Sequence, residues 1–252
     1  MNNIPIALQM YSLREESKYD FVGMLKKVAD LGYDGVELAG YGGLTTKILR
    51  QLLDEHGLKA ASSHIPLNDL KNNLDQVIAD QKILGSNYIV CPFLPPESRT
   101  EQSYQKLIHL LDHVGEKCRT AGITLCYHNH DFELDRLADG RMALEAILDD
   151  TSPENVQAEF DIYWLAKGNE DPVDWLERYK GRTPLVHLKD MTTDHEQFFA
   201  ELGTGGVDID SVLEKGNSND IKWWVVEQDE SRLTPFKSID ISINYLKNKF
   251  AK

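Results

Sequence analysis

The chain has 252 residues, of which 41% are hydrophobic, and its 41 acidic and 27 basic side chains give a formal net charge of -14. This hydrophobic content is typical of a globular protein with a substantial core, and it excludes a disordered or fibrous chain. The negative charge repels phosphate backbones and anionic membrane surfaces, so we expect neither a nucleic acid nor a membrane as partner.

Targeting signals and cysteine pairs are missing from the sequence. The N-terminal residues show no charged segment followed by a long apolar one, and no later apolar run approaches the length of a membrane span. We therefore expect a cytoplasmic protein. Cys91, Cys118 and Cys126 contain no closely spaced pair, which favours buried, reduced thiols over disulfides or a thiolate zinc site.

Short β-type runs alternate with longer amphipathic segments along the whole chain, and no linker rich in Pro, Ser or Gly separates them. Several helical patterns end at a glycine, which supplies the positive φ that stops a helix, as at Gly32, Gly57 and Gly122 after the predicted helices 20–31, 45–56 and 102–121. We expect strands at residues 6–11, 35–38, 59–64, 88–92, 123–128, 156–161, 183–189 and 223–227.

These eight units over 252 residues average roughly 31 residues each, which matches a (β/α)8 barrel near its usual size. The sequence therefore predicts an α/β protein with a single TIM barrel domain over residues 1–252. A doubly wound open sheet is the alternative. It would place a glycine-rich phosphate turn after the first strand, where residues 9–14 are Gln-Met-Tyr-Ser-Leu-Arg.

Predicted strand five ends in the segment 127–133, Tyr-His-Asn-His-Asp-Phe-Glu. Side chains alternate between the two faces of a strand, so His128 and His130 point the same way. Neutral imidazole is the commonest metal ligand and titrates near neutrality, so this pair is a candidate for metal binding or acid–base chemistry. The alternative is a pair of ordinary surface histidines where a strand ends in water.

Polar side chains stand at the end of nearly every predicted strand, where its apolar pattern runs out. In a closed barrel all these ends open into one cup, so the residues become neighbours whatever their distance in sequence. Each has a structural explanation by itself, such as a turn cap or a backbone hydrogen bond, but together they predict one polar site. The residues are Gln9, Glu37, His64, His128, His130, Glu159, Asp161, His187, Lys189, Asp190, Glu227 and Asp229.

A cup of carboxylates and imidazoles without thiolates suits a divalent ion, and Mn²⁺ is the expected cofactor, with Mg²⁺, Co²⁺, Fe²⁺ and Zn²⁺ as alternatives. Such an ion can hold a carbonyl and an adjacent hydroxyl oxygen of a sugar and stabilise the enediolate that forms when a neighbouring C–H proton is removed. Return of the proton to the neighbouring carbon is isomerisation, and return to the opposite face is epimerisation. Loss of a β-hydroxyl group is dehydration.

Five segments, 35–38, 127–133, 159–164, 186–190 and 226–229, together resemble the sugar phosphate isomerase/epimerase family, the xylose isomerase-like TIM barrels. The similarity runs almost from end to end. In this superfamily a divalent ion is held by Glu, Asp, His and Glu from the ends of strands five to eight. The resemblance implies that Asp161, His187 and Glu227 are metal ligands.

The strand-five ligand is where the chain departs from this pattern, because His128 occupies the place of the usual glutamate and Glu133 follows five residues later. Either His128 is the fourth ligand, which we favour, or Glu133 folds back and leaves the histidines for proton transfer. The departure weakens an epimerase mechanism with two metal-bound glutamates on opposite faces of the substrate. A strand five that ends in histidines resembles the branch of the family with inosose dehydratase-like and keto-glycoside-processing members.

Catalytic roles are expected for His130, Glu133, Lys189 and Glu227. Lys189 shares a strand face with His187, so its ammonium could bind a substrate oxygen or stabilise an enolate, although a salt bridge to a carboxylate is the alternative.

Substrate contacts are expected from Lys189 and from Glu37, His64 and Trp164, the last three of which could equally pack the barrel rim. The glycines of segment 201–208 could offer backbone N–H groups to a phosphate or belong to a flexible loop over the substrate.

The leading hypothesis is a metal-dependent isomerase or epimerase that acts on a small carbohydrate through an enediolate. The alternative enzyme is a lyase that eliminates water or a glycosidic group from a keto-sugar or keto-inositol. A non-catalytic sugar-binding barrel is the alternative from another class, and the chain could form a homo-oligomer. Cleavage of damaged DNA is disfavoured by the charge of -14.

Overall fold

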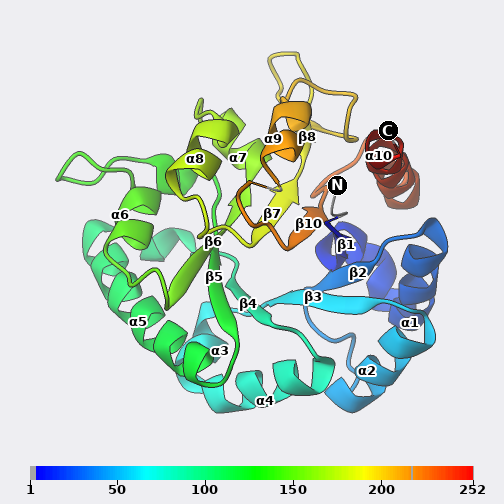
Figure 1. Ribbon diagram of the computed structural model, residues 1–252, viewed down its shortest axis with the longest axis horizontal. Helices are drawn as coiled ribbons and strands as arrows, with labels where there is room; N and C mark the ends of the chain where they lie inside the picture. Colours follow the sequence, from blue (N-terminus) through cyan, green and yellow to red (C-terminus); the bar gives the residue numbers. More distant parts are fainter. Residues whose placement is uncertain (1–3, 217, 252) are drawn as a thin grey trace.

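The computed structural model describes residues 4–216 and 218–251. Their parallel strands close into one barrel, in which β1 lies between β2 and β10 and the others follow in chain order (Figure 1). The predicted single (β/α)8 barrel is confirmed. The barrel strands are β1 (Ile6–Gln9), β2 (Gly35–Leu38), β3 (Lys59–His64), β4 (Tyr88–Cys91), β5 (Thr124–His128), β6 (Val156–Asp161), β7 (Leu185–Leu188) and β10 (Trp223–Val226).

Helices surround the barrel and connect its strands (Figure 1). Three short 3-10 helices, η1 (Met10–Leu13), η2 (Pro96–Ser98) and η3 (Phe132–Leu134), follow β1, β4 and β5. The α-helices are α1 (Arg14–Leu31), α2 (Thr46–Glu55), α3 (Leu67–Asn72), α4 (Leu74–Leu84), α5 (Glu101–Thr120), α6 (Ala143–Asp149), α7 (Ile162–Lys167), α8 (Pro172–Arg178), α9 (Ile209–Lys215) and α10 (Pro235–Phe250).

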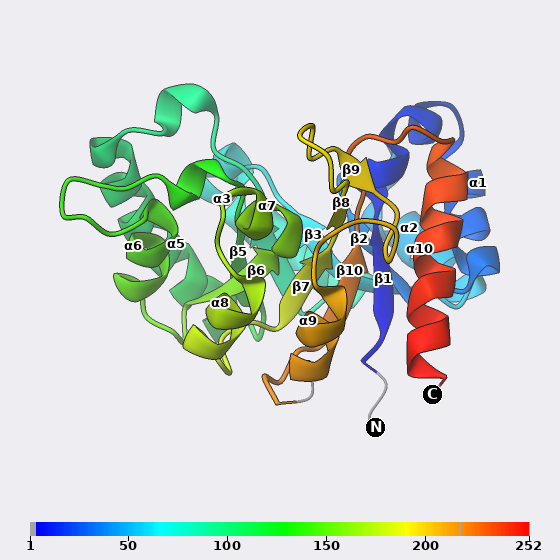
Figure 2. The same ribbon diagram turned by 90° about the horizontal axis from the view of Figure 1, so that it is seen from above.

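Local side-chain hydrogen bonds explain where the elements depart from their predicted bounds. β1 stops at Gln9, two residues early, because the Gln9 side chain accepts a hydrogen bond of 2.9 Å from the Tyr11 N–H and starts η1. α1 begins before the predicted residue 20, but Asp20 interrupts it with φ -153° and accepts a hydrogen bond from the Gly23 N–H. After β7 the chain forms an unpredicted small hairpin of β8 (Asp190–Met191) and β9 (Phe199–Ala200), seen beyond the end of β7 in Figure 2.

The outer faces of the strands and the inner faces of the helices form the main hydrophobic core. Five strands each turn a large apolar side chain outward toward the helices, and each of these side chains is at most 1% exposed. They are Leu8, Val36, Tyr127, Phe160 and Trp224. Burial of each such side chain contributes about 1.5–3 kcal/mol relative to exposure, so this layer fixes which strand face looks into the barrel.

The inward faces carry an apolar layer and, above it, a polar one. Ala7, Cys126, Leu185 and Val225 are fully buried inside the barrel, and two residues later the same strands place Gln9, His128, His187 and Glu227. The strands are parallel, so all four polar side chains rise to the carboxyl end of the barrel. The period of the strands thus assembles the predicted cup.

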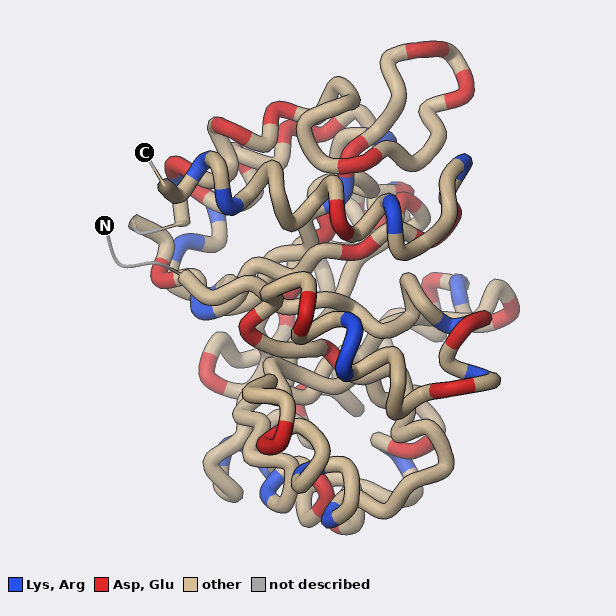
Figure 3. Tube along the Cα trace, turned by 90° about the vertical axis from the view of Figure 1, so that its right-hand side faces the viewer, with Lys and Arg blue, Asp and Glu red and all other residues tan. Residues whose placement is uncertain are grey.

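The distribution of charged residues and the burial of the cysteines agree with what the sequence predicts. In Figure 3 the lysine and arginine positions are spread among acidic ones, and no continuous basic stripe follows this face. Within the described ranges, no helix is long and apolar enough to cross a membrane. Cys91, Cys118 and Cys126 are buried free thiols, as predicted, and burial raises the pKa of Cys91 and of Cys118 to about 12.

Gly115 lets α5 pack directly on the backbone before β6. A Cβ atom at this position would lie 2.1 Å from the Asn155 carbonyl oxygen, so Gly115→Ala must push the helix away. We expect a loss of about 2 kcal/mol in the free energy of unfolding, because overpacking outweighs the gain of about 1 kcal/mol in helix propensity. Urea unfolding measures it, with Glu116→Ala on the exposed side of α5 as control. Equal midpoints for the two variants would contradict this packing.

Candidate metal centre

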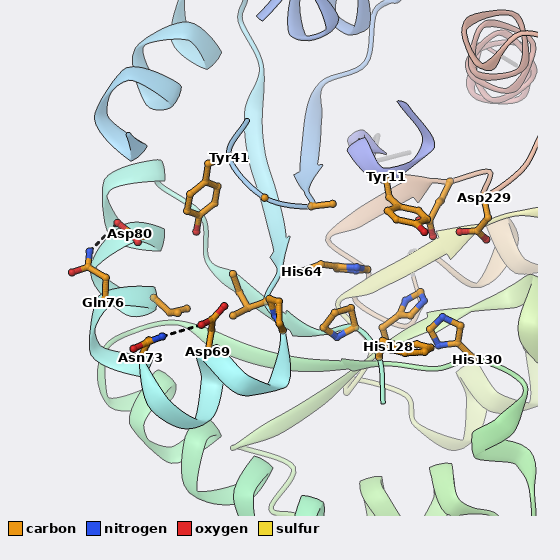
Figure 4. A pocket seen from close by; sticks show the side chains of 18 of the residues that line it. Tyr11, Tyr41, His64, Asp69, Asn73, Gln76, Asp80, His128, His130 and Asp229 are labelled. Atoms are coloured by element: carbon orange, nitrogen blue, oxygen red, sulfur yellow. Dashed lines mark hydrogen bonds between the residues drawn. The ribbon is translucent and has the colours of Figure 1, made fainter. Parts of the chain in front are cut away.

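A cavity of about 890 Å³ opens at the carboxyl ends of the barrel strands (Figure 4). His64, His128, His130, Lys189 and Glu227 line its inner part, and Figure 4 shows the labelled histidines gathered around one space. The structure therefore brings together side chains from β3, β5, β7 and β10 and the residues that follow them.

Four side chains have ligand atoms that all lie within 4.8 Å of one another: His128 and Glu227, which line the cavity, and Asp161 and His187, which are fully buried behind its wall. The register explains their meeting, because β6 pairs Asp161 with His187 on β7. His187 Nδ1 is 3.0 Å from a Glu227 oxygen and 3.9 Å from Asp161 Oδ2, while His128 Nε2 is 3.8 Å from the same Asp161 oxygen. These three separations are all short enough for two donor atoms to share one ion at bond lengths near 2.1 Å.

Asp161 has a different task for each of its carboxylate oxygens. Oδ1 accepts hydrogen bonds from the Tyr163 and Trp164 N–H groups, at 3.0 and 3.1 Å, and so caps α7. Oδ2 faces the two histidines. The Asn129 side chain holds the Asp161 backbone by accepting its N–H at 2.9 Å. Sequence reasoning missed Asn129, whose signal was only its place between the two histidines.

Buried carboxylates hold the inner nitrogens of the two ligand imidazoles. Glu159 Oε2 lies 3.1 Å from His128 Nδ1, and Glu37 Oε1 lies 2.6 Å from His187 Nε2. With the proton on each inner nitrogen, the outer nitrogens present lone pairs toward Asp161 and Glu227, which is the usual arrangement behind metal-binding histidines. Glu159 also belongs to a second, deeper group of possible ligands, formed with His64, His128 and His187.

Lys189 is the ammonium group of the cup. Its Nζ lies 2.9 Å from Asp161, 2.6 Å from Glu227 and 2.8 Å from Asp229. Burial opposes its charge, but these carboxylates raise the pKa of Lys189 well above its usual value. Burial raises the pKa of Asp161 to about 6, although Lys189 and His187 act in the opposite direction.

The cup holds more carboxyl groups than bases that carry a proton, as far as the described residues go. Burial opposes a charge on His64, but Glu37 and then Glu159 raise its pKa to about 10. His64, His187 and Lys189 hold a proton more readily than usual, but the carboxyl groups outnumber these three cations, so a divalent cation would supply positive charge to the cup. These carboxyls belong to Glu37, Glu159, Asp161, Glu227 and Asp229.

Two residues predicted to contact substrate lie outside the cavity wall. Glu37 is fully buried beneath the cup, where it also accepts hydrogen bonds from the Gln9 side chain at 2.7 Å and from the Ser62 hydroxyl. Trp164 packs near His130, with ring centroids 5.4 Å apart, and its indole N–H has no partner among the described residues. His64 and Lys189 do line the cavity.

Glu133, the other candidate for the fourth ligand, turns back into its own loop. One oxygen accepts a hydrogen bond from the Tyr127 hydroxyl at 2.7 Å, and the other accepts one from the His130 N–H at 2.7 Å. Burial raises the pKa of Glu133 to about 7. Both groups of possible ligands among the described residues contain His128 and not Glu133.

The glycine-rich segment 201–208 directs its N–H groups toward a protein carboxylate. Gly203, Gly205 and Val207 donate hydrogen bonds of 3.0, 2.9 and 3.0 Å to Asp190. The same carboxylate accepts the Met191 N–H at 2.8 Å. Asp190 thus occupies the donors that the sequence offered to a phosphate group, and it anchors the segment to the end of β7.

Known proteins share this barrel over nearly its whole length. Inosose dehydratase of Geobacillus kaustophilus is 25% identical, with 88% of this chain and 85% of the relative covered. A crystal structure of a sugar phosphate isomerase/epimerase from Parabacteroides distasonis has a TM-score of 0.84 at 26% identity and covers 97% of this chain and 98% of its own. The IOLI protein, solved with a bound zinc atom, has the same fold at 15% identity, with a TM-score of 0.76 and 97% of each chain covered. The family model for the xylose isomerase-like TIM barrel matches residues 25–249, so this chain belongs to that family.

Proposed function

We propose that this protein is a divalent-metal-dependent enzyme that removes a proton beside the carbonyl group of a sugar or sugar derivative and, through the resulting enediolate, acts as an isomerase or epimerase. One observation carries the proposal: His128, Asp161, His187 and Glu227 converge next to the cavity, which His128 and Glu227 line, with the Lys189 ammonium beside them.

The upper group of ligands fits the metal better than the deeper one. Each group has two members that line the cavity, but in the deeper group Glu159 lies behind the imidazoles and orients them, whereas Glu227 of the upper group faces the cavity, where a substrate oxygen can reach an ion. Two nitrogen and two oxygen donors without thiolate suit Mn²⁺, and also Mg²⁺, Co²⁺, Fe²⁺ or Zn²⁺. An ion bound there would polarise the carbonyl group and stabilise negative charge on its oxygen.

The remaining side chains of the cavity supply binding and proton transfer. Lys189 lines the cavity, and its ammonium stabilises negative charge that develops on a substrate oxygen. His130 lines the cavity, and its Nδ1 has no partner among the described residues, so it is placed to hold or move a proton at a substrate hydroxyl. Glu227 is the carboxylate of the cavity floor that can accept the carbon-bound proton.

A lyase is the second candidate, and the relatives favour it, because the inosose dehydratases match this chain over most of its length. The first step is shared: a base removes the proton next to the carbonyl. In the lyase, the electron pair of that C–H bond then expels a hydroxyl or glycosidic oxygen from the β-carbon, which leaves with a proton. The strand-five histidine, which replaces one of two opposing glutamates, makes transfer on one face of the substrate the simpler chemistry.

The metal centre is tested by loading the purified protein with Mn²⁺ and measuring the bound ion by plasma mass spectrometry. We expect about one ion per chain, and its loss in Asp161→Ala/His187→Ala, because two of four ligands are gone. His128→Ala should bind the ion ~10–100-fold more weakly.

His130→Ala is the matched control, since it removes the neighbouring imidazole of the same motif and leaves all four ligands. It should keep the ion and lose turnover. Full metal retention in the Asp161/His187 double variant, with its circular dichroism unchanged, would rule out this centre. Two ions per wild-type chain would indicate that the deeper group also binds metal, and would contradict a single site.

Glu133 is tested through the pH dependence of stability. Its pKa of about 7 in the folded protein lies above the usual 4.5, so its stabilising effect is complete below pH 4.5 and is lost as the pH rises through 7. Relative to Glu133→Gln, metal-free wild type should lose ~3 kcal/mol of unfolding free energy between pH 5 and pH 8. Urea unfolding at each pH measures the difference, and exposed Glu154→Gln is the control. Parallel pH profiles for wild type and Glu133→Gln would disprove the shifted pKa.

The two reactions differ in their products. Incubation of the Mn²⁺-loaded protein with aldoses, ketoses and keto-inositols in D₂O should give a product of unchanged composition with solvent deuterium on carbon, as isomerisation through an enediolate requires. Mass spectrometry and ultraviolet absorbance are read together. Loss of water or of an alcohol with a new enone absorbance would assign the lyase instead, and turnover that persists in EDTA would reject both.

A further inference from the structure

The cavity continues well beyond the metal centre. From His64 it extends between the end of β2 and the helices α3 and α4, as Figure 4 shows. We call this extension the distal arm. It is lined by Tyr41, Asp69, Asn73, Gln76, Val77 and Asp80.

The volume is too large for a single sugar ring. At roughly 30 Å³ for each heavy atom, a hexose would leave more than half of the 890 Å³ empty. Sites for small molecules usually bury most of their ligand's surface. A ligand that occupies the metal centre and also fills the distal arm therefore has a second ring.

The walls of the distal arm suit the two kinds of surface that a sugar presents. Tyr41 and Val77 offer apolar surface to the faces of a ring. Asp69 Oδ1 accepts a hydrogen bond from Asn73 at 2.9 Å, and Asp80 Oδ1 accepts one from Gln76 at 3.1 Å. The second oxygen of each carboxylate accepts no hydrogen bond from the described side chains and can take one from a sugar hydroxyl.

Tyr41 adds a hydroxyl donor at the same place. Its oxygen accepts a hydrogen bond from Gln81 at 3.0 Å, and its own proton is donated to none of the described residues. Burial, together with the carboxylates of Asp80 and Asp69, raises the pKa of Tyr41 to about 12, so the phenol keeps that proton.

The charges of the cavity disfavour a phosphorylated ligand. Of the described residues that line it, Lys189 is the only lysine or arginine, and three carboxylates already surround its ammonium. Asp69 and Asp80 are the acidic side chains that line the distal arm, and their negative charge would repel a phosphate. The backbone donors of segment 201–208 are occupied by Asp190.

We propose that the substrate is an unphosphorylated glycoside of two sugar rings, with the carbonyl-bearing ring at the metal centre and the second ring in the distal arm, between Tyr41 and the carboxylates of Asp69 and Asp80. The placement of the first ring rests on the proposed function. The second ring binds through hydroxyl groups that donate to the two carboxylates.

Calorimetric titration of the Mn²⁺-loaded protein tests this assignment. The probes are cellobiose, maltose, lactose, sucrose and trehalose, their component monosaccharides, and the 6-phosphate of the disaccharide that binds most tightly. We expect at least one disaccharide to bind ~10-fold or more tightly than its monosaccharides, as about 1.4 kcal/mol of added contacts would give. Its 6-phosphate should bind at least ~10-fold more weakly than the neutral sugar.

Asp69→Asn/Asp80→Asn keeps both Oδ1 acceptors but removes the charges. It should abolish the disaccharide advantage and narrow the difference between the neutral sugar and its 6-phosphate, while metal content and monosaccharide affinity stay unchanged. Asp75→Asn, an exposed change on α4 outside the cavity lining, is the matched control and should behave as wild type.

Three results would overturn the inference: no disaccharide that binds better than its monosaccharides, a phosphate that binds more tightly than its parent sugar, or an advantage that survives in the double variant. Failure of the proposed function is separate from these. It would show as absence of bound Mn²⁺, which is measured on the same samples before titration.

Discussion

The site depends on pairing negative charge inside a closed barrel. Glu37 and Glu159 are fully buried, and an isolated carboxylate in such surroundings would cost several kcal/mol. His187 lies within hydrogen-bond distance of Glu37, and His64 and His128 are similarly close to Glu159, so each acid is matched by an imidazole. The other nitrogens of His128 and His187 face Asp161 and Glu227. The imidazoles that pair with the buried carboxylates below the cup are therefore the same ones that offer ligand atoms within it.

Much of this arrangement could be predicted from the sequence, because it follows from a two-residue period. A strand that packs Tyr127 outward must turn Cys126 and His128 inward, and parallel strands bring their ends to one side. The barrel and the shared cup of strand-end residues follow from that regularity, whereas the choice of Asp161, His187 and Glu227 as ligands rests on the resemblance to the family. The two-residue period does not tell which strands and loops lie next to each other across the barrel. The structure shows this, and these neighbours determine the hydrogen-bond partners of each polar side chain.

The features that could not be predicted depend on loop conformation and on contacts between elements far apart in the chain. Glu133 sits five residues beyond His128, and only the turn of η3 decides that its carboxylate bonds to Tyr127 and the His130 N–H. Segment 201–208 contains glycines like those of phosphate-binding loops, but no sequence pattern indicates that Asp190 accepts the hydrogen bonds of their N–H groups. The distal arm arises where the loop after β2 meets α3 and α4, a proximity that no local spacing encodes.

The two oxygens of Asp161 bear on how such a site can change. One caps α7 and the other faces the histidines, so a replacement here alters both a helix end and the metal site. Among the described residues, the His128 imidazole has no hydrogen bond to the backbone, and its polar partners are the side chains of Glu159 and Asp161. The four ligand positions are thus unequal in their freedom to vary. Redesign of the metal preference should begin at the strand-five position, where the resemblance to the family implies a glutamate in place of His128.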